Sequence, residues 1–83
     1  MIEMTNSVLL KVNDINDIVK LHHTISTFSG EANLVKGRYK CNAKSLMGLL
    51  AIDTSEPTKL EFDISYTQEI LDLMKDFIYK KLE

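Results

Sequence analysis

Apolar residues recur along this chain at two spacings, which together predict seven secondary-structure elements in the order βαββαβα. Alternating apolar and polar positions are typical of half-buried strands, and apolar positions three and four residues apart are typical of helices. Strands are predicted over residues 7–12, 31–36, 38–41 and 58–64. Helices are predicted over residues 13–29, 45–52 and 65–82. Elements with one apolar side each predict a two-layer α+β domain.

The same pattern predicts which side chains meet in the core between the two layers. The strands are expected to direct inward Val8, Leu10, Val12, Leu60, Phe62 and Ile64. The first helix is expected to bury Ile15, Ile18, Val19, Leu21, Ile25 and Phe28. The last helix is expected to bury Ile70, Leu71, Met74, Phe77, Ile78 and Leu82.

Polar residues indicate where each predicted helix begins. Asn13 and Asp14 are alternative N-caps of the first helix, because either side chain can accept a hydrogen bond from a free backbone N–H of the first turn. Ser45 is the expected N-cap of the short middle helix. Ser65 and Gln68 have the spacing of a capping box at the start of the last helix.

The middle helix is too apolar to bury all of its side chains on one side. We expect Leu49, Leu50 and Ile52 to face the core. Leu46 and Met47 would then lie at the surface beside the capping serine, where an exposed apolar pair indicates a docking patch for another protein. Methionine suits such a patch because its flexible side chain adapts to different partners.

Composition narrows the classes of function. With 10 basic and 12 acidic residues, the net charge of −2 gives no case for nucleic-acid binding. The single cysteine, Cys41, cannot form an internal disulfide. The first residues do not resemble a signal peptide, and no segment has the ~20 apolar residues of a membrane span. We therefore expect one cytoplasmic domain over residues 1–83. We also expect a monomer with no cofactor, no metal and no enzymatic activity.

The stretch around the middle helix resembles a known family. Residues 42–50, Asn-Ala-Lys-Ser-Leu-Met-Gly-Leu-Leu, are similar to the Asn-x-Lys-Ser-Ile-Met-Gly signature of HPr, the small phosphocarrier of the bacterial sugar phosphotransferase system. Gly37 stands where that family places a turn glycine between its second and third strands. The resemblance implies a four-stranded antiparallel sheet of strand order 1-4-2-3, covered on one side by three helices.

The same resemblance implies roles for the residues of this signature. In HPr of Gram-positive bacteria the equivalent of Ser45 is phosphorylated by a dedicated kinase, and the equivalents of Leu46 and Met47 belong to the surface that meets partner proteins. Lys44 and Gly48 complete the predicted partner-binding set. The implied partners are an HPr kinase/phosphorylase, a transcriptional co-repressor partner or other proteins of the phosphotransferase system.

The start of the first helix departs from the family pattern. HPr carries phosphate on a histidine within Gly-Ile/Leu-His-Ala-Arg-Pro, whereas residues 12–17 of this chain are Val-Asn-Asp-Ile-Asn-Asp. An ungapped alignment puts Asp14 in the histidine position and Asn16 in the arginine position. Keeping the first strand in register instead requires a shorter loop, and neither alignment supplies a histidine. His22 and His23 fall in mid-helix, where no free N–H can hold a phosphate, so we interpret them as structural or surface residues.

Three hypotheses about function follow from these observations. The first is an HPr-like regulatory protein without the histidine relay, modified on Ser45 and docking through Leu46 and Met47. The second is an HPr-fold binding module whose partner has no connection with sugar transport. The third is a phosphocarrier with a displaced acceptor, such as Asp14 or one of the two histidines.

Overall fold

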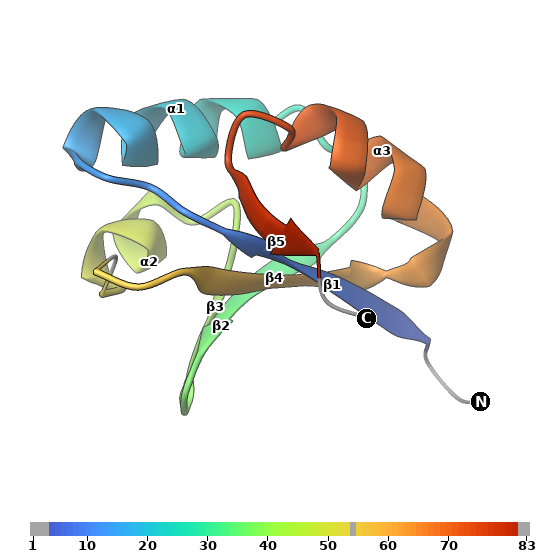
Figure 1. The fold of residues 1–83 in the computed structure, drawn as a ribbon, viewed down its shortest axis with the longest axis horizontal. Coiled ribbons are helices and arrows are strands. Elements are labelled where there is room, and N and C mark those ends of the chain that lie inside the picture. Colours follow the sequence, from blue (N-terminus) through green and yellow to red (C-terminus); the bar gives the residue numbers. More distant parts are fainter. Residues whose placement is uncertain (1–3, 54, 82–83) are drawn as a thin grey trace.

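A sheet of five antiparallel strands lies beneath three helices in the computed structural model, which describes residues 4–53 and 55–81 (Figure 1). The strands are β1 (Thr5–Leu10), β2 (Ala32–Lys36), β3 (Tyr39–Asn42), β4 (Thr58–Asp63) and β5 (Ile78–Lys81). The helices are α1 (Ile15–Ile25), α2 (Leu46–Ala51) and α3 (Thr67–Leu73), and a 3-10 turn, η1 (Ile64–Tyr66), precedes α3. This arrangement confirms the predicted two-layer α+β architecture.

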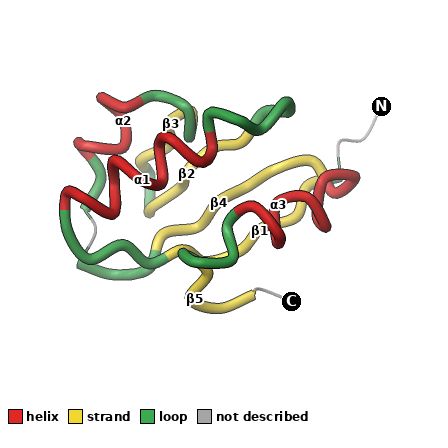
Figure 2. Tube along the Cα trace, turned by 90° about the horizontal axis from the view of Figure 1, so that it is seen from above, coloured by secondary structure: helices red, strands yellow, loops and turns green. Residues whose placement is uncertain are grey.

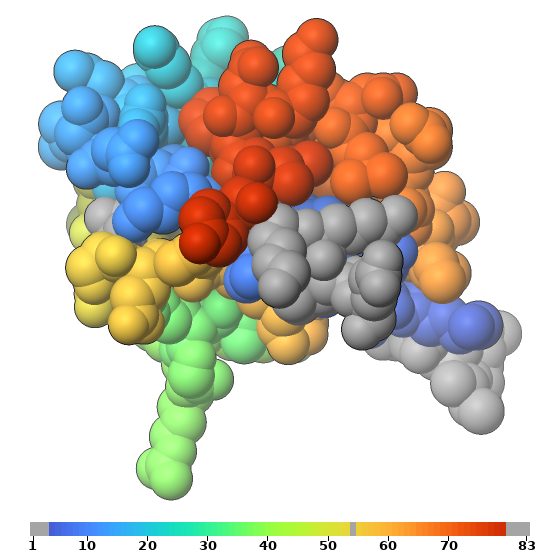
Figure 3. All heavy atoms as spheres, in the orientation of Figure 1, coloured from blue at the N-terminus to red at the C-terminus, as the bar shows by residue number. Residues whose placement is uncertain are grey.

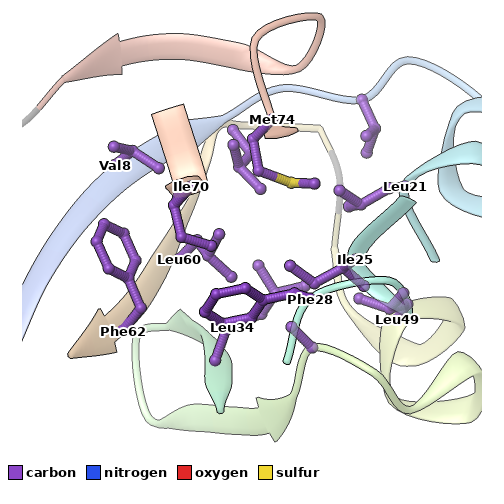
Figure 4. Packing of buried hydrophobic residues seen from close by; sticks show 14 of the residues in the cluster. Val8, Leu21, Ile25, Phe28, Leu34, Leu49, Leu60, Phe62, Ile70 and Met74 are labelled. Carbon is purple, nitrogen blue, oxygen red and sulfur yellow. The ribbon is translucent and has the colours of Figure 1, made fainter. Parts of the chain in front are cut away.

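The core lies between the sheet and the helices, where buried side chains from both layers meet (Figure 4). In the centre of the sheet, Val8 of β1 pairs with Leu60 of β4, and both side chains are buried. Among the described residues, the largest side chains that are almost fully buried are Phe28, Ile25, Leu49, Leu60, Ile70, Met74 and Val8. Every strand residue predicted to face inward is buried except Ile64, which follows the end of β4 and is exposed.

The C-terminal part of the chain differs from the prediction. The four predicted strands keep the expected order, but β5 pairs with the free edge of β1, so the order is β3-β2-β4-β1-β5. The last helix, predicted over 65–82, ends at Leu73 because the chain turns back through Met74, whose carbonyl accepts hydrogen bonds from Phe77 N and Ile78 N. The Phe77 carbonyl then accepts from Lys11 N at 2.8 Å and extends the link to the N-terminal strand. Leu82, assigned to that helix from sequence, lies outside the described residues.

The N-caps predicted for the first two helices are confirmed, and the one predicted for the last helix is not. Asp14 is the N-cap of α1, and its Oδ1 accepts a hydrogen bond from Asp17 N at 3.0 Å. Ser45 is the N-cap of α2. The capping box predicted at Ser65 is wrong, because Ser65 lies within η1 and donates from its backbone N–H to Asp63 Oδ1. Helix α3 starts instead after Tyr66, which makes no side-chain capping hydrogen bond.

The hairpin of β2 and β3 projects from the body of the molecule (Figure 3). Its turn places Gly37 at a φ of 59°, a left-handed conformation that glycine adopts without steric cost. The turn glycine expected between these strands is therefore present. None of the helices in the described part of the chain is long and apolar enough to cross a membrane.

Candidate functional site

Ser45 stands at the start of α2 with its side chain engaged in the cap. The residue has extended backbone angles, φ −88° and ψ 111°, and its Oγ accepts a hydrogen bond from Gly48 N at 3.1 Å. The Ser45 carbonyl accepts from Leu49 N at 3.0 Å, which closes the first turn of the helix. Ser45 as a whole residue is half-buried.

The turn before Ser45 is held by a short series of hydrogen bonds. Asn42 accepts twice, from Ser45 N through its carbonyl at 2.9 Å and from Lys44 N through its Oδ1 at 2.8 Å. The Lys44 carbonyl lies 3.1 Å from Nε2 of His22 on α1. The Lys44 ammonium lies 5.8 Å from the centre of the Phe28 ring, within the range of a cation–π interaction. These contacts give Ser45 a defined position between α1 and β3.

Gly48 lets α2 approach β3 closely. A Cβ atom at this position would lie 2.9 Å from the Cβ and 3.0 Å from the sulfur of Cys41. The Tyr39 hydroxyl donates to the Gly48 carbonyl at 3.1 Å, and partial burial beside the Cys41 thiol raises the pKa of Tyr39 above its ordinary value. Gly48, predicted from sequence as a partner-binding residue, therefore packs against the sheet, and Cys41 is half-buried beside it.

The side of α2 that turns away from the core is apolar. Met47 is 79% exposed, Leu46 38% and Leu50 44%, whereas Leu49 is 1% exposed. The predicted exposure of Leu46 and Met47 is confirmed. The prediction that Leu50 faces the core is wrong, because adjacent helix residues diverge by about 100° and Leu49 already occupies the buried direction.

Helix α1 extends this apolar area with two residues that the sequence assigned to the core. Ile15 is 63% exposed and Val19 52%. Both lie on the same flank of α1 as His22, at positions i, i+4 and i+7, and His22 contacts the turn before α2. Figure 2 shows α1 running alongside α2, with the start of α1 beside the end of α2.

We call the five exposed residues the apolar surface; its members are Ile15, Val19, Leu46, Met47 and Leu50. The sequence did contain a signal for the α1 half. Ile15 and Val19 widen the apolar face formed by Ile18, Leu21 and Ile25 beyond what one side of a helix can bury.

The start of α1 is occupied by carboxylates that bind its own backbone. Asp14 Oδ1 accepts from Asp17 N, and Asp17 Oδ2 accepts from Asn13 N at 2.8 Å. His22 and His23 lie in the last turn of α1, with His22 half-buried and His23 exposed. The structure therefore brings His22 to Lys44 and places neither histidine at the start of the helix.

No metal site is evident in the part of the chain that the structure describes. Among residues 4–53 and 55–81, no three His, Cys, Asp or Glu side chains lie close enough together to hold an ion. The described residues place the Ser45 hydroxyl beside exposed apolar side chains of α2.

Comparison with known proteins shows similarity in structure. No family model matches the chain, and no curated protein matches its sequence significantly. The fold is similar to the crystal structure of HPr-C-His from Thermoanaerobacter tengcongensis, with a TM-score of 0.59 and 23% sequence identity. The similarity covers 92% of this chain and 93% of the other. The chain therefore has an HPr-like fold, which agrees with the resemblance found around residues 42–50.

Proposed function

We propose that this chain is an HPr-like regulatory protein of the phosphotransferase system that lacks the histidine relay site, is phosphorylated on Ser45 and docks partner proteins through its apolar surface. It acts in the cytoplasm by binding and has no enzymatic activity of its own. Its expected partners are an HPr kinase/phosphorylase and a transcriptional co-repressor partner or another protein of the phosphotransferase system.

The observation that carries this proposal is the position of Ser45 beside an unusually apolar exposed helix. Helix α2 contains no polar side chain, and two of its exposed residues, Leu46 and Met47, directly follow the serine. Phosphorylation would add about −1.5 to −2 charges at pH 7 next to these apolar groups. A partner that binds the apolar surface would then distinguish the two states of the serine.

The start of α1 supports the absence of a relay. In HPr the phosphate is held by free helix amides and an arginine, whereas here Asp14 and Asp17 accept from the backbone N–H groups at this helix start. Carboxylates at this place would repel an incoming phosphoryl group. Asp14 therefore acts as a helix cap in this proposal.

A second candidate is a binding module with an unrelated partner. Asn16, which is exposed, stands where the ungapped alignment with HPr has an arginine. A partner that recognises the arginine of HPr would find no charged side chain at this position of this chain. This observation favours a different partner for the same apolar surface.

Phosphorylation assays separate these functions. The purified chain is incubated with an HPr kinase and ATP, and separately with phosphoenolpyruvate and the first enzyme of the phosphotransferase system, and the modified residue is located by mass spectrometry. We expect the kinase to modify wild type but not Ser45→Ala, and no phosphate transfer from phosphoenolpyruvate. No modification in either reaction would favour the unrelated binding module. Phosphoenolpyruvate-dependent labelling that is lost in His22→Gln or His23→Gln would establish a displaced acceptor instead.

A further inference from the structure

His22 contacts the one peptide group that links Lys44 to Ser45. The carbonyl of this peptide, Lys44 O, lies 3.1 Å from His22 Nε2, and its N–H, Ser45 N, lies 2.9 Å from Asn42 O. A planar peptide bonded through both its carbonyl and its N–H has little freedom to rotate. The orientation of this plane decides where the next residue directs its side chain.

The hydrogen bond also requires a proton on one particular nitrogen of the ring. A carbonyl oxygen can only accept, so Nε2 of His22 must carry the proton that it shares with Lys44 O. His22 therefore donates either as the Nε2–H tautomer or as the imidazolium. The other histidine, His23, is exposed and takes no part in this contact.

We propose that His22 is a positioning residue for Ser45, which fixes the peptide before the serine and holds the α1 and α2 halves of the apolar surface in register. His22 is on the same flank of α1 as Ile15 and Val19, so its hydrogen bond ties their helix directly to the turn that starts α2. This role requires no phosphate on the histidine. Its effect on Ser45 modification rests on the proposed function, whereas its effect on the geometry of the turn does not.

The geometric role is tested by amide hydrogen exchange on the full chain, followed by NMR. In His22→Leu we expect the Ser45 and Gly48 amides to exchange about fivefold faster, the effect of losing one hydrogen bond, while the Ile70 and Leu60 amides in the core change little. His22→Gln, whose amide N–H can reach the same carbonyl, should restore the protection. His23→Leu is the matched control and should leave the Ser45 amide unchanged. Equal protection of Ser45 in His22→Leu and wild type would overturn the proposal.

A measurement on the unaltered chain covers the case in which His22→Leu does not fold. The ¹⁵N chemical shifts of the imidazole report its tautomer, and we expect His22 to be protonated at Nε2. A neutral His22 ring with its proton on Nδ1 would overturn the proposal, because that ring cannot donate to Lys44 O.

The functional role is tested with an HPr kinase and ATP. We expect His22→Leu to raise the KM for the chain about fivefold, with kcat less affected, and His22→Gln to restore it. Failure of the kinase to modify wild type would reject the proposed function and leave the exchange result standing. Equal KM values for wild type and His22→Leu would overturn the positioning role at Ser45.

Discussion

A side chain at Gly48 would collide with Cys41, because a Cβ atom there lies 2.9 Å from the Cβ of the cysteine. At this point the backbone of α2 lies directly against the Cys41 side chain of β3. Met47, the residue before Gly48, is largely exposed. Gly48 therefore contributes to the apolar surface indirectly, because it lets α2 pack closely against β3.

Gly48→Ala should destabilise the fold although alanine is the better helix former. We expect a loss of about 1–3 kcal/mol in the free energy of unfolding, measured with urea, because the added methyl must push α2 away from β3. Ala51→Gly on the exposed side of the same helix is the control, and it should cost at most about 1 kcal/mol through helix propensity alone. A more stable Gly48→Ala variant would show that α2 moves without cost.

Substitutions of Ser45 should separate its capping role from its charge. Ser45→Ala removes the acceptor for Gly48 N and should cost about 1 kcal/mol in thermal or urea unfolding. Ser45→Asp should stay close to wild type in stability, since aspartate also caps helices. It should still weaken partner binding, because it places charge beside Met47. Ser29→Ala, at an exposed serine outside the helices, is the control for stability. Equal stability of Ser45→Ala and wild type would contradict the capping role.

Met47→Glu should change binding and leave folding almost untouched. The side chain is largely exposed, so the free energy of unfolding should stay within about 0.5 kcal/mol of wild type. Leu49→Ala, two residues along and fully buried, should cost about 2–5 kcal/mol in the same melts.

The binding half of this prediction needs a control elsewhere on the molecule. Titration against an HPr kinase or a co-repressor partner should show weaker binding for Met47→Glu than for wild type. Ile64→Glu changes an exposed apolar residue outside the apolar surface and should bind like wild type. Equal affinities of wild type and Met47→Glu would exclude the apolar surface as the docking site.

The turn at Asp63 should weaken in acid. Asp63 Oδ1 accepts from Ser65 Oγ at 2.7 Å and from Ser65 N at 2.8 Å, and these hydrogen bonds lower the pKa of Asp63 below its ordinary value of 3.8. Because the pKa of Asp63 is lower in the folded state, its carboxylate stabilises the folded chain to the full extent at pH values above the ordinary pKa. Its contribution is lost as the pH falls below about 4 and through the folded pKa.

An NMR titration of the side-chain carboxyls checks the cause of this shift. Ser65→Ala removes the hydroxyl donor and should move the pKa of Asp63 upward, toward 3.8. Asp53 is the internal control: its pKa is lowered chiefly by the backbone N–H of Ser55, and it should titrate unchanged in Ser65→Ala. An unaltered Asp63 titration would assign the shift to other groups.

A designed disulfide should distinguish β5 from a longer last helix. Leu9 of β1 pairs with Lys80 of β5, and directly opposed strand residues have Cα atoms close enough for a disulfide. In a Cys41→Ala background, Leu9→Cys with Lys80→Cys should cross-link under mild oxidation. Val35→Cys with Lys59→Cys, across β2 and β4, is the positive control. A cross-link in the control alone would mean that residues 78–81 are not paired with β1.

Local signals account for the parts of the fold that the sequence predicted. Asp14 and Ser45 are good N-caps by residue type, and both cap their helices. The last helix was predicted too long because the spacing of Ile70, Met74 and Phe77 fits a helix equally well. Only the free edge of β1, which exists once the sheet has formed, favours a strand at this point.

The candidate site, like the fold, was predicted from the sequence only in part. The exposure of Met47 beside Ser45 was predicted, because a short apolar helix cannot bury every side. The contact of His22 was not predicted, because it depends on how α1 is placed against α2. Ile15 and Val19 were assigned to the core although, with Ile18, Leu21 and Ile25, they form an apolar face wider than one side of a helix can bury. Contacts between two helices depend on tertiary packing. The periodicity of one segment carries no information about that packing.

The strand order also determines the order in which contacts can form during folding. Lys36 pairs with Tyr39 across the Gly37 turn, so these two residues are close in the sequence. Hairpins of this kind typically form within about 1–10 microseconds. Thr5 pairs with Asp63, so the central strands β1 and β4 come from opposite parts of the chain and meet only after a long loop has closed. During synthesis β1 therefore waits for β4, whereas both strands of the β2–β3 hairpin are made before β4. The strand β2 takes part in both kinds of contact, since it pairs with β3 on one side and with β4 on the other.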